Sequence, residues 1–325
     1  MPPLEDPGRR LTVHRVQARW LGIAPVWRGA LWMLLSALLF AVMGMLVKWL
    51  GSRLDSFQVA FFRAGFGFLI ILPFALAAGP SVLRPKRPGM HLLRGLLGAS
   101  GMSCSFYALA HLPLAQATAY SFTKPLFLVL LAALFLGEKV RLRRLSATIV
   151  GFLGVLVMMR PTGGIDPTAL VAVFGTALTA GVVVTVKLLL RTERPVTVMF
   201  WFGLISSLLT LLPALYVWVP PTSRELLLLL ATGAVGASAQ SAMLRGYLLA
   251  EATALAPFSY VQLIFAGVLG YVVFAEVPGL QTLIGAAIIV GSTLYIAYRE
   301  AALARQAKLP AKEKKADSAL NRQDR

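Results

Sequence analysis

Long apolar runs make up most of the chain, and short breaks containing proline, glycine or charged residues separate them. A helix needs roughly 20 apolar residues to cross about 30 Å of hydrocarbon, and the runs have about this length. The pattern therefore predicts an all-α membrane protein with ten transmembrane helices. Their expected ranges are 29–50, 57–78, 90–110, 114–137, 144–160, 168–189, 197–218, 226–249, 253–274 and 280–298.

The composition indicates the same class of protein. Of the 325 residues, 58% are hydrophobic and only 14% are charged, with a mean hydropathy of +0.76. Soluble domains carry about 25% charged residues, so a water-soluble globule and a disordered chain are both excluded. The single cysteine, Cys104, excludes an internal disulfide and a cysteine-based zinc cluster, and we expect it to pack as a small apolar residue.

The charge is strongly positive, with 31 Lys and Arg residues against 13 Asp and Glu residues and a net charge of +18. The basic residues gather in alternate connections, namely 1–28, 84–87, 139–144, 191–194 and 299–325, whereas the other connections carry only Arg53, Arg160 and Arg224. Lys and Arg accumulate on the cytoplasmic side of a membrane. We therefore expect a membrane protein with a cytoplasmic N-terminus, 1–28, and a disordered cytoplasmic tail, 299–325. This arrangement explains the charge without a nucleic acid partner.

The chain contains an internal repeat. At an offset of 138 residues, Gly98-Ala99-Ser100 meets Gly236-Ala237-Ser238. The other matches are Ser121 with Ser259, Phe127 with Phe265, Glu138 with Glu276 and, one or two residues further apart, Lys48 with Lys187 and Pro73 with Pro213. They divide the chain into two halves of five spans, 29–160 and 161–298.

An odd number of spans in each half places the second half upside down relative to the first. The loop charges agree, because GEKVRLRR after the fourth span is basic whereas the equivalent AEVPGLQT has no basic residue. Inverted repeats are the architecture of many secondary transporters, whose substrate site lies near the bilayer midplane between the repeats. The symmetry therefore favours a transporter.

Three strings carry a family resemblance: FQVAFFRAG, SFYALAHLPLAQATAYSFTKPLFLVLLAALFLGEKV and ALAPFSYVQLIFAGVLGYVVFAEVP. With these strings, residues 29–298 resemble the drug/metabolite transporter superfamily, in its ten-span bacterial branch built from two inverted five-helix EamA repeats. The resemblance implies secondary transport of a small organic metabolite by alternating access. Within the superfamily the chain looks most like the subset with S-adenosylmethionine and riboflavin transporters; other members export amino acids and metallophores.

Lys124 is the first candidate for substrate binding. It lies ten residues into a predicted span, which at 1.5 Å per residue is about 15 Å deep, and its repeat mate is Gln262. No Asp or Glu lies in the middle of any predicted span, so a carboxylate or phosphate of the substrate is the expected partner. The alternative is a lysine solvated by cavity water or bonded to helix carbonyls that Pro125 leaves free.

Aromatic and hydroxyl residues surround this position in both halves. The candidate substrate contacts beside Lys124 and Gln262 are Tyr120, Ser121, Phe122, Thr123, Ser259 and Tyr260. Aromatic faces with a few polar donors suit a metabolite with a planar or partly apolar body. The alternative is a helix interface in which the hydroxyls bond to neighbouring helices. We expect the cavity to lie between the third, fourth, eighth and ninth spans.

Other charged residues have structural alternatives. Arg63 and Arg245 are candidates for a gate or an anion contact. Lys48, Arg94 and Lys187 lie closer to span ends, where extension of the side chain to the lipid headgroups is expected. Glu138 and Glu276 end equivalent spans and are expected to cap helices or to carry loop charge; the alternative is a gate that pairs with a basic residue.

Motifs for enzyme chemistry are missing from the sequence. There is no GxxxxGK[ST] string, and the three histidines, His14, His91 and His111, are scattered. We therefore expect no catalytic residues, metal or cofactor, and partners limited to the bilayer and a small-molecule substrate. A membrane-embedded transferase would be the other class, and the choice between monomer and homodimer stays open.

Overall fold

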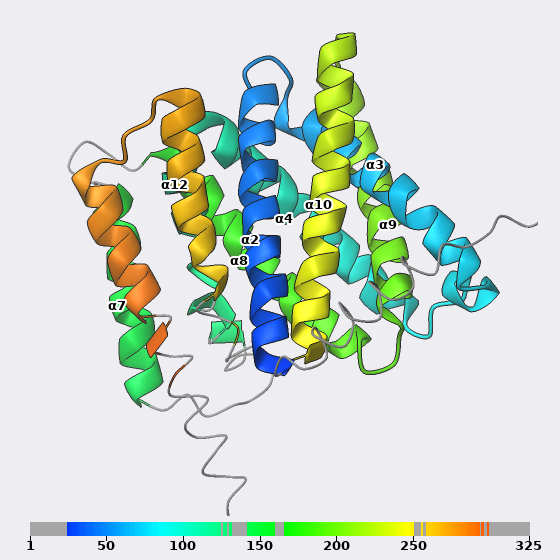
Figure 1. The fold of residues 1–325 in the computed structure, drawn as a ribbon, viewed down its shortest axis with the longest axis horizontal. Coiled ribbons are helices and arrows are strands. Elements are labelled where there is room, and N and C mark those ends of the chain that lie inside the picture. The colour runs from blue at the N-terminus through cyan, green and yellow to red at the C-terminus, as the bar shows by residue number, and fades with distance from the viewer. Residues whose placement is uncertain are drawn as a thin grey trace, which may run out of the picture.

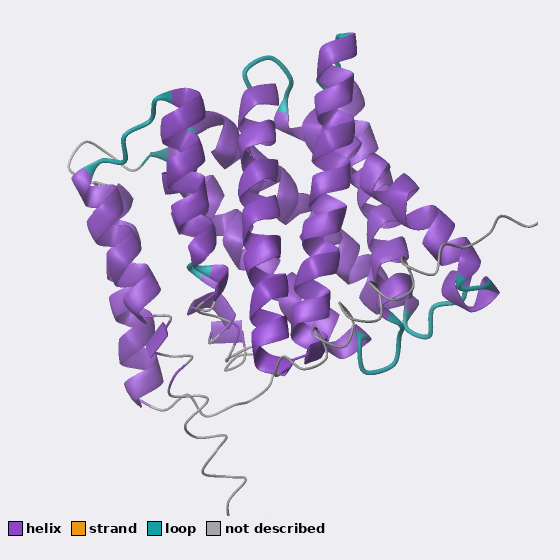
Figure 2. Cartoon of the chain, viewed as in Figure 1, coloured by secondary structure: helices purple, strands orange, loops and turns teal. Residues whose placement is uncertain are grey.

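The structure is a computed structural model, and it describes residues 25–124, 126–128, 130–131, 142–159, 166–249, 255, 258–292, 294–295 and 298 (Figure 1). Within these residues the regular structure is helical throughout and contains no strand (Figure 2). Several features predicted above lie outside the described residues: the N-terminus to residue 24, Pro125, Glu138, loop 139–141, the tail from 299 and the side chain of Lys187.

Each of the ten predicted spans contains a helix. In chain order the helices are α2 (Pro25–Leu50), α3 (Ser56–Ala77), the short 3₁₀ helix η1 (Pro80–Leu83), α4 (Pro88–His111), α5 (Leu114–Ser121), α7 (Leu142–Met159), α8 (Pro167–Leu189), α9 (Pro195–Tyr216), α10 (Ser223–Leu249), α12 (Val261–Phe274) and a final helix, Leu280–Ser292. Among the described residues, α2, α3, α8, α9 and α10 are long and apolar enough to cross a membrane, and three further helices are apolar but shorter.

Local chemistry explains where several helices begin. Asp55 and Asp166 precede α3 and α8, and each carboxylate accepts a backbone N–H two residues later at 2.8 Å. Such side chains satisfy N–H groups that have no partner within the helix. Helices α4, α8 and α9 begin with proline, whose missing N–H is not needed in the first turn.

The helices form two packed rows (Figure 1). Helices α12, α2 and α10 lie side by side in the front row, with α3 and α9 beyond α10. Helix α8 packs on α4 and α5 behind them. Helix α7 and the final helix lie together at the opposite edge, where Gly154 faces Ile288. Neighbours in space are thus drawn from both halves of the chain.

Two helix pairs repeat one arrangement. Helix α2 runs antiparallel to α10, since Met43 lies against Gly236 and Met33 against Gly246, and the Ser36 hydroxyl donates to the carbonyl of Ala239 at 2.9 Å. Helix α4 runs antiparallel to α8 in the same way, with Leu97 beside Gly181 and Cys104 beside Gly175. At the offset of 138, α2 is equivalent to α8 and α10 to α4, so the two pairs are mates.

Small residues allow these helices to approach closely. A Cβ atom added to Gly175 would lie 2.6 Å from the Cβ of Cys104, and one added to Gly101 would lie 2.9 Å from Thr179. Gly95 and Gly98 likewise leave no room for a side chain against Ile205 and Phe202 of α9. This is the helix packing expected in lipid, where small residues rather than apolar burial bring helices together.

Large apolar side chains are exposed on the surface of the molecule, while some charged side chains are buried inside it. Leu212 and Leu248 are 76% and 71% exposed, whereas Arg63 and Arg94 are 7% and 1% exposed. In a soluble protein the distribution is the reverse, because leucines are mostly buried and arginines mostly exposed. The observed distribution is the one expected when lipid replaces water as the surrounding medium.

Candidate functional site

The span that contains Lys124 is broken. Helix α5 ends at Ser121, Phe122 and Thr123 form a turn, and the chain is helical again at Lys124. The Thr123 hydroxyl donates to the carbonyl of Tyr120 at 2.7 Å, satisfying an acceptor at the end of the helix. A proline at position 125 has no N–H for the carbonyl of Ser121, which explains a break here. The equivalent span of the second half also has a turn, at Tyr260, just before α12.

The two breaks touch each other. The rings of Phe122 and Tyr260 lie 4.9 Å apart between centroids, and these residues are mates at the offset of 138. Equivalent residues of two repeats that are related by a two-fold axis can touch only when they lie close to that axis. Lys124 and Gln262 follow two residues later, and both are partly buried. Within the described part of the chain, neither side chain makes a hydrogen bond or an ion pair.

The hydroxyl residues of this cluster bond mainly to their own helix. The Tyr120 ring is fully buried in an apolar cluster, with its hydroxyl 3.5 Å from the Gln116 amide nitrogen. The Ser121 hydroxyl donates to the carbonyl of Thr118 at 2.6 Å. These bonds stay within the segment around α5 and do not cross to a neighbouring helix, as the alternative required, so substrate contact by Tyr120, Ser121 and Thr123 stays a prediction. Ser259 and Tyr260 are partly buried, and each takes part in an interaction.

A small cavity lies beside Arg63 instead. It has a volume of about 20 Å³ and is formed by α3, α9 and α10, with Arg63, Gly67, Phe202 and Gln240 in its lining. These helices correspond to the second, seventh and eighth predicted spans, so this cavity differs from the one expected between the third, fourth, eighth and ninth. Arg63, a candidate anion contact from the sequence, is thus placed at a cavity.

Arg94 was predicted to extend to the headgroups, and this prediction is wrong. Its Nη1 donates to the carbonyl of Val198 at 2.9 Å, and its guanidinium lies 4.2 Å from the centre of the Phe202 ring. Helix α9 packs across this part of α4 and covers the side chain. The lack of Asp and Glu in the middle of the predicted spans was a clue that a buried arginine has no acidic partner. No residue near Arg94 in the sequence indicated which helix covers it.

Lys48 also differs from its prediction. Its ammonium lies 2.8 Å from Glu276 Oε1 and donates to the carbonyl of Leu112 at 2.6 Å. The other carboxylate oxygen, Glu276 Oε2, accepts the N–H of Leu114 at 2.7 Å, at the first residue of α5. Glu276 therefore caps a helix, as expected. It also pairs with a basic residue of the other half, which is the contact that the alternative role as a gate requires.

Arg245 is not among the residues that line the cavity beside Arg63. Its side chain is exposed on α10, and its guanidinium lies 4.8 Å from the centre of the Trp32 ring. The structure thus separates the two arginines that the sequence grouped together, because Arg63 faces inward between helices and Arg245 faces outward.

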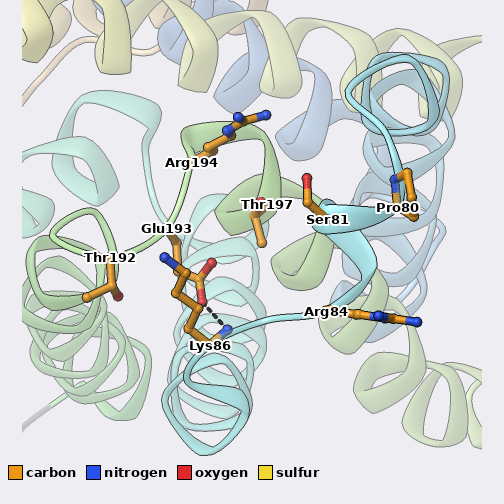
Figure 3. Close-up of a pocket in the computed structure, with 8 residues that line it drawn as sticks. All are labelled: Pro80, Ser81, Arg84, Lys86, Thr192, Glu193, Arg194 and Thr197. Carbon is orange, nitrogen blue, oxygen red and sulfur yellow. Dashed lines mark hydrogen bonds between the residues drawn. The ribbon is translucent and has the colours of Figure 1, made fainter.

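A larger, open pocket of about 570 Å³ lies where η1 meets the beginning of α9 (Figure 3). Arg84, Lys86 and Arg194 give it a basic lining, and the Glu193 carboxylate accepts the backbone N–H of Lys86 at 2.5 Å. The sequence assigned these residues to two cytoplasmic loops, 84–87 and 191–194, but did not predict that the loops converge. Basic residues in cytoplasmic loops would suit the anionic surface of a membrane.

Comparisons with known proteins agree with the helical architecture. The EamA-like transporter family matches the chain twice, at residues 27–160 and 167–298. The S-adenosylmethionine uptake transporter of Rickettsia prowazekii is 35% identical over 84% of this chain and 93% of its own length. The riboflavin transporter of Rhizobium johnstonii is 34% identical over 84% and 91%, and the pseudopaline exporter of Pseudomonas aeruginosa is 32% identical over 81% and 93%.

The fold also resembles a solved crystal structure. The two share a TM-score of 0.56 and 24% sequence identity, over 83% of this chain and 98% of the other. At this level of identity the likeness concerns the fold alone.

Proposed function

The chain belongs to the EamA-like transporter family, and from this premise we propose that it carries a small organic metabolite across the bacterial inner membrane by alternating access. Its relatives are transporters and its helices are apolar, so it is a multi-pass membrane transporter. We further propose that it is a secondary transporter built from two inverted halves. The main support is the packing of the equivalent helix pairs, α2 with α10 and α8 with α4.

The directions of the helices support the inverted repeat. Helices α2 and α4 end on the same side of the molecule, because Lys48 reaches the carbonyl of Leu112 and Gly51 lies against Ala110. Helix α8 is antiparallel to α4 and therefore runs opposite to α2, its own mate. Two halves related in this way form equivalent interfaces on the two sides of a membrane, which is the basis of alternating access.

The side where α2 and α4 end is held closed by contacts between the two halves. Lys48 pairs with Glu276, and the exposed Arg53 pairs with Glu225 at 2.5 Å. The Gln58 amide both donates to and accepts from the backbone of Val219, at 2.7 and 3.1 Å. With a cytoplasmic N-terminus, this side faces the periplasm, and these contacts must break for substrate to enter from there.

Uptake of S-adenosylmethionine is the substrate assignment best supported, with riboflavin as the second candidate. The names of the relatives support both. The buried basic residues favour S-adenosylmethionine, because its methionyl group carries a carboxylate whereas riboflavin has no acidic group. Export of carboxylate-bearing metabolites such as amino acids is the alternative, since the same charges would serve either direction.

The test is uptake by the purified protein in liposomes. S-adenosylmethionine and riboflavin are supplied outside, each in labelled form, and protein-free liposomes are the control. We expect saturable accumulation of S-adenosylmethionine that unlabelled S-adenosylmethionine competes away. Accumulation of riboflavin alone would move the assignment to the second candidate. If vesicles loaded with amino acids release them while neither labelled compound enters, the protein is an exporter.

A further inference from the structure

Arg63 and Arg94 are buried between the helices, and neither has an acidic partner among the described residues. The described residues contain five carboxylates, and each is engaged at a helix end. Asp55 and Asp166 cap helices, Glu193 accepts the N–H of Lys86, Glu225 pairs with Arg53 and Glu276 pairs with Lys48. A buried charge is strongly unfavourable unless it is paired. Two such charges retained in a membrane protein indicate a functional site.

The surroundings of Arg63 leave space for its guanidinium. A Cβ atom added to Gly236 would lie 3.0 Å from Arg63 Nε and 3.1 Å from Nη2, and one added to Gly67 would lie 3.6 Å from Nη1. Any other residue at position 236 would therefore push the guanidinium away. Within the described residues the Arg63 side chain makes no hydrogen bond or ion pair, so its donors are available to a ligand.

Arg94 lies behind the same cavity. The Phe202 ring lines the cavity, and the Arg94 guanidinium stacks on that ring. Nη1 of Arg94 is bonded to the carbonyl of Val198, while its buried Nε has no partner. Arg94 does not line the cavity itself. It fixes the position of Phe202 and adds a second positive charge close to the first.

We propose that Arg63 binds the carboxylate of the transported metabolite, with Arg94 as a positioning residue that holds Phe202 and strengthens the positive potential. The proposal rests on the proposed function and names its substrate class, a metabolite with at least one carboxylate. A guanidinium matches a carboxylate with two parallel N–H donors. The cavity of about 20 Å³ admits a group the size of a water molecule, so α9 and α10 must separate from α3 for substrate to enter.

Binding of a small carboxylate tests the site without requiring transport. The melting temperature (Tm) of the purified protein is measured in sodium formate and in sodium chloride at equal ionic strength. A ligand that binds only the folded protein raises Tm. We expect saturating formate to raise Tm by about 3 °C above the value in chloride. Equal Tm values in the two salts would overturn the carboxylate assignment.

Variants locate the effect. Arg63→Gln should abolish the formate-dependent rise, and Arg63→Lys, which keeps the charge without the planar fork, should retain only part of it. Arg191→Gln, which removes an exposed loop arginine, is the matched control and should keep the full rise. A full rise in both Arg63→Gln and Arg63→Lys would exclude Arg63 as the ligand. Cooperative melting of each variant in chloride shows that it is folded.

Transport separates this proposal from the general function. Liposomes with the wild-type protein are offered S-adenosylmethionine and its decarboxylated analogue. We expect uptake of the analogue to be at least about tenfold slower, and Arg63→Gln to lower only the uptake of S-adenosylmethionine. Equal uptake of both compounds would overturn the carboxylate site while leaving the transporter intact. A formate effect without any transport would contradict the proposed function and support the site.

Discussion

Arg63 and Phe202 occupy equivalent places in the two halves of the chain, yet one is charged and the other apolar. Both project against the glycine of a Gly-Ala-Ser string in a neighbouring helix. The Arg63 guanidinium lies against Gly236 of α10, and the Phe202 ring lies against Gly98 of α4. Their positions differ by 139 residues, the same interval as Lys48 and Lys187, and both residues line the same small cavity.

The difference separates architecture from chemistry. The small residues recur in both halves, because both interfaces need the same close approach of helices. Among the described side chains, the buried arginines belong to the first half only, since Arg63 lies on α3 and Arg94 on α4. A symmetric scaffold with an asymmetric site can present equivalent interfaces to the two sides of the membrane while it binds an asymmetric metabolite in one orientation.

The largest effect should come from filling the space at Gly236. Gly236→Val places a branched side chain against Arg63 and Met43, and overpacking of this kind destabilises a core by about 1–3 kcal/mol. We expect a lower Tm and loss of uptake. Gly267→Val is the control, because a Cβ atom at Gly267 has no neighbour within 4 Å. An equal loss of stability in both variants would mean that the Arg63 environment is not tightly packed.

Replacing Arg63 with the residue type of its equivalent, Phe202, should separate an effect on substrate binding from an effect on folding. In Arg63→Phe, the first half carries the residue type of the second. We expect S-adenosylmethionine uptake to fall by about 10- to 100-fold, since a charge-assisted hydrogen bond contributes about 1.5–3 kcal/mol. Tm should stay the same or rise, because an unpaired buried charge is removed. A variant with normal uptake would show that the asymmetry has no role in transport.

A smaller effect is expected at the Lys48–Glu276 pair, which joins the two halves. Both side chains are partly exposed, so Glu276→Gln should lower the stability by only about 1 kcal/mol. It should also increase the labelling of a cysteine introduced at Leu54, a buried position on the same side. A double-mutant cycle with Lys48→Met measures the coupling. The exposed Arg53–Glu225 pair provides the comparison, with Arg53→Ala expected to have less effect.

Much of the fold could be predicted from the sequence because its signals are local. Apolar runs of membrane-crossing length placed a helix in each expected range, and Pro88, Pro167 and Pro195 mark helix starts. The break near Lys124 follows from the backbone chemistry of proline at 125. These features depend on residues that are close together along the chain.

The site was less predictable because its contacts join distant segments. Arg94 is covered by Val198 and Phe202 of α9, more than one hundred residues away. Its position six residues into α4 gave no sign of that cover, and the prediction of a headgroup contact was therefore wrong. The roles of Lys124 and Gln262 in substrate binding stay predictions. The structure adds that they lie beside the contact between Phe122 and Tyr260.

The central claim is that two inverted halves surround the site, and cysteine labelling tests it most directly. Cys104 is first replaced by serine, and Arg141→Cys or Gly279→Cys is then introduced after the two equivalent spans. Intact cells are treated with a membrane-impermeant maleimide before and after permeabilisation. The account predicts that Gly279→Cys is labelled in intact cells and Arg141→Cys only after permeabilisation. Labelling of both positions from the same side would contradict the inverted repeat.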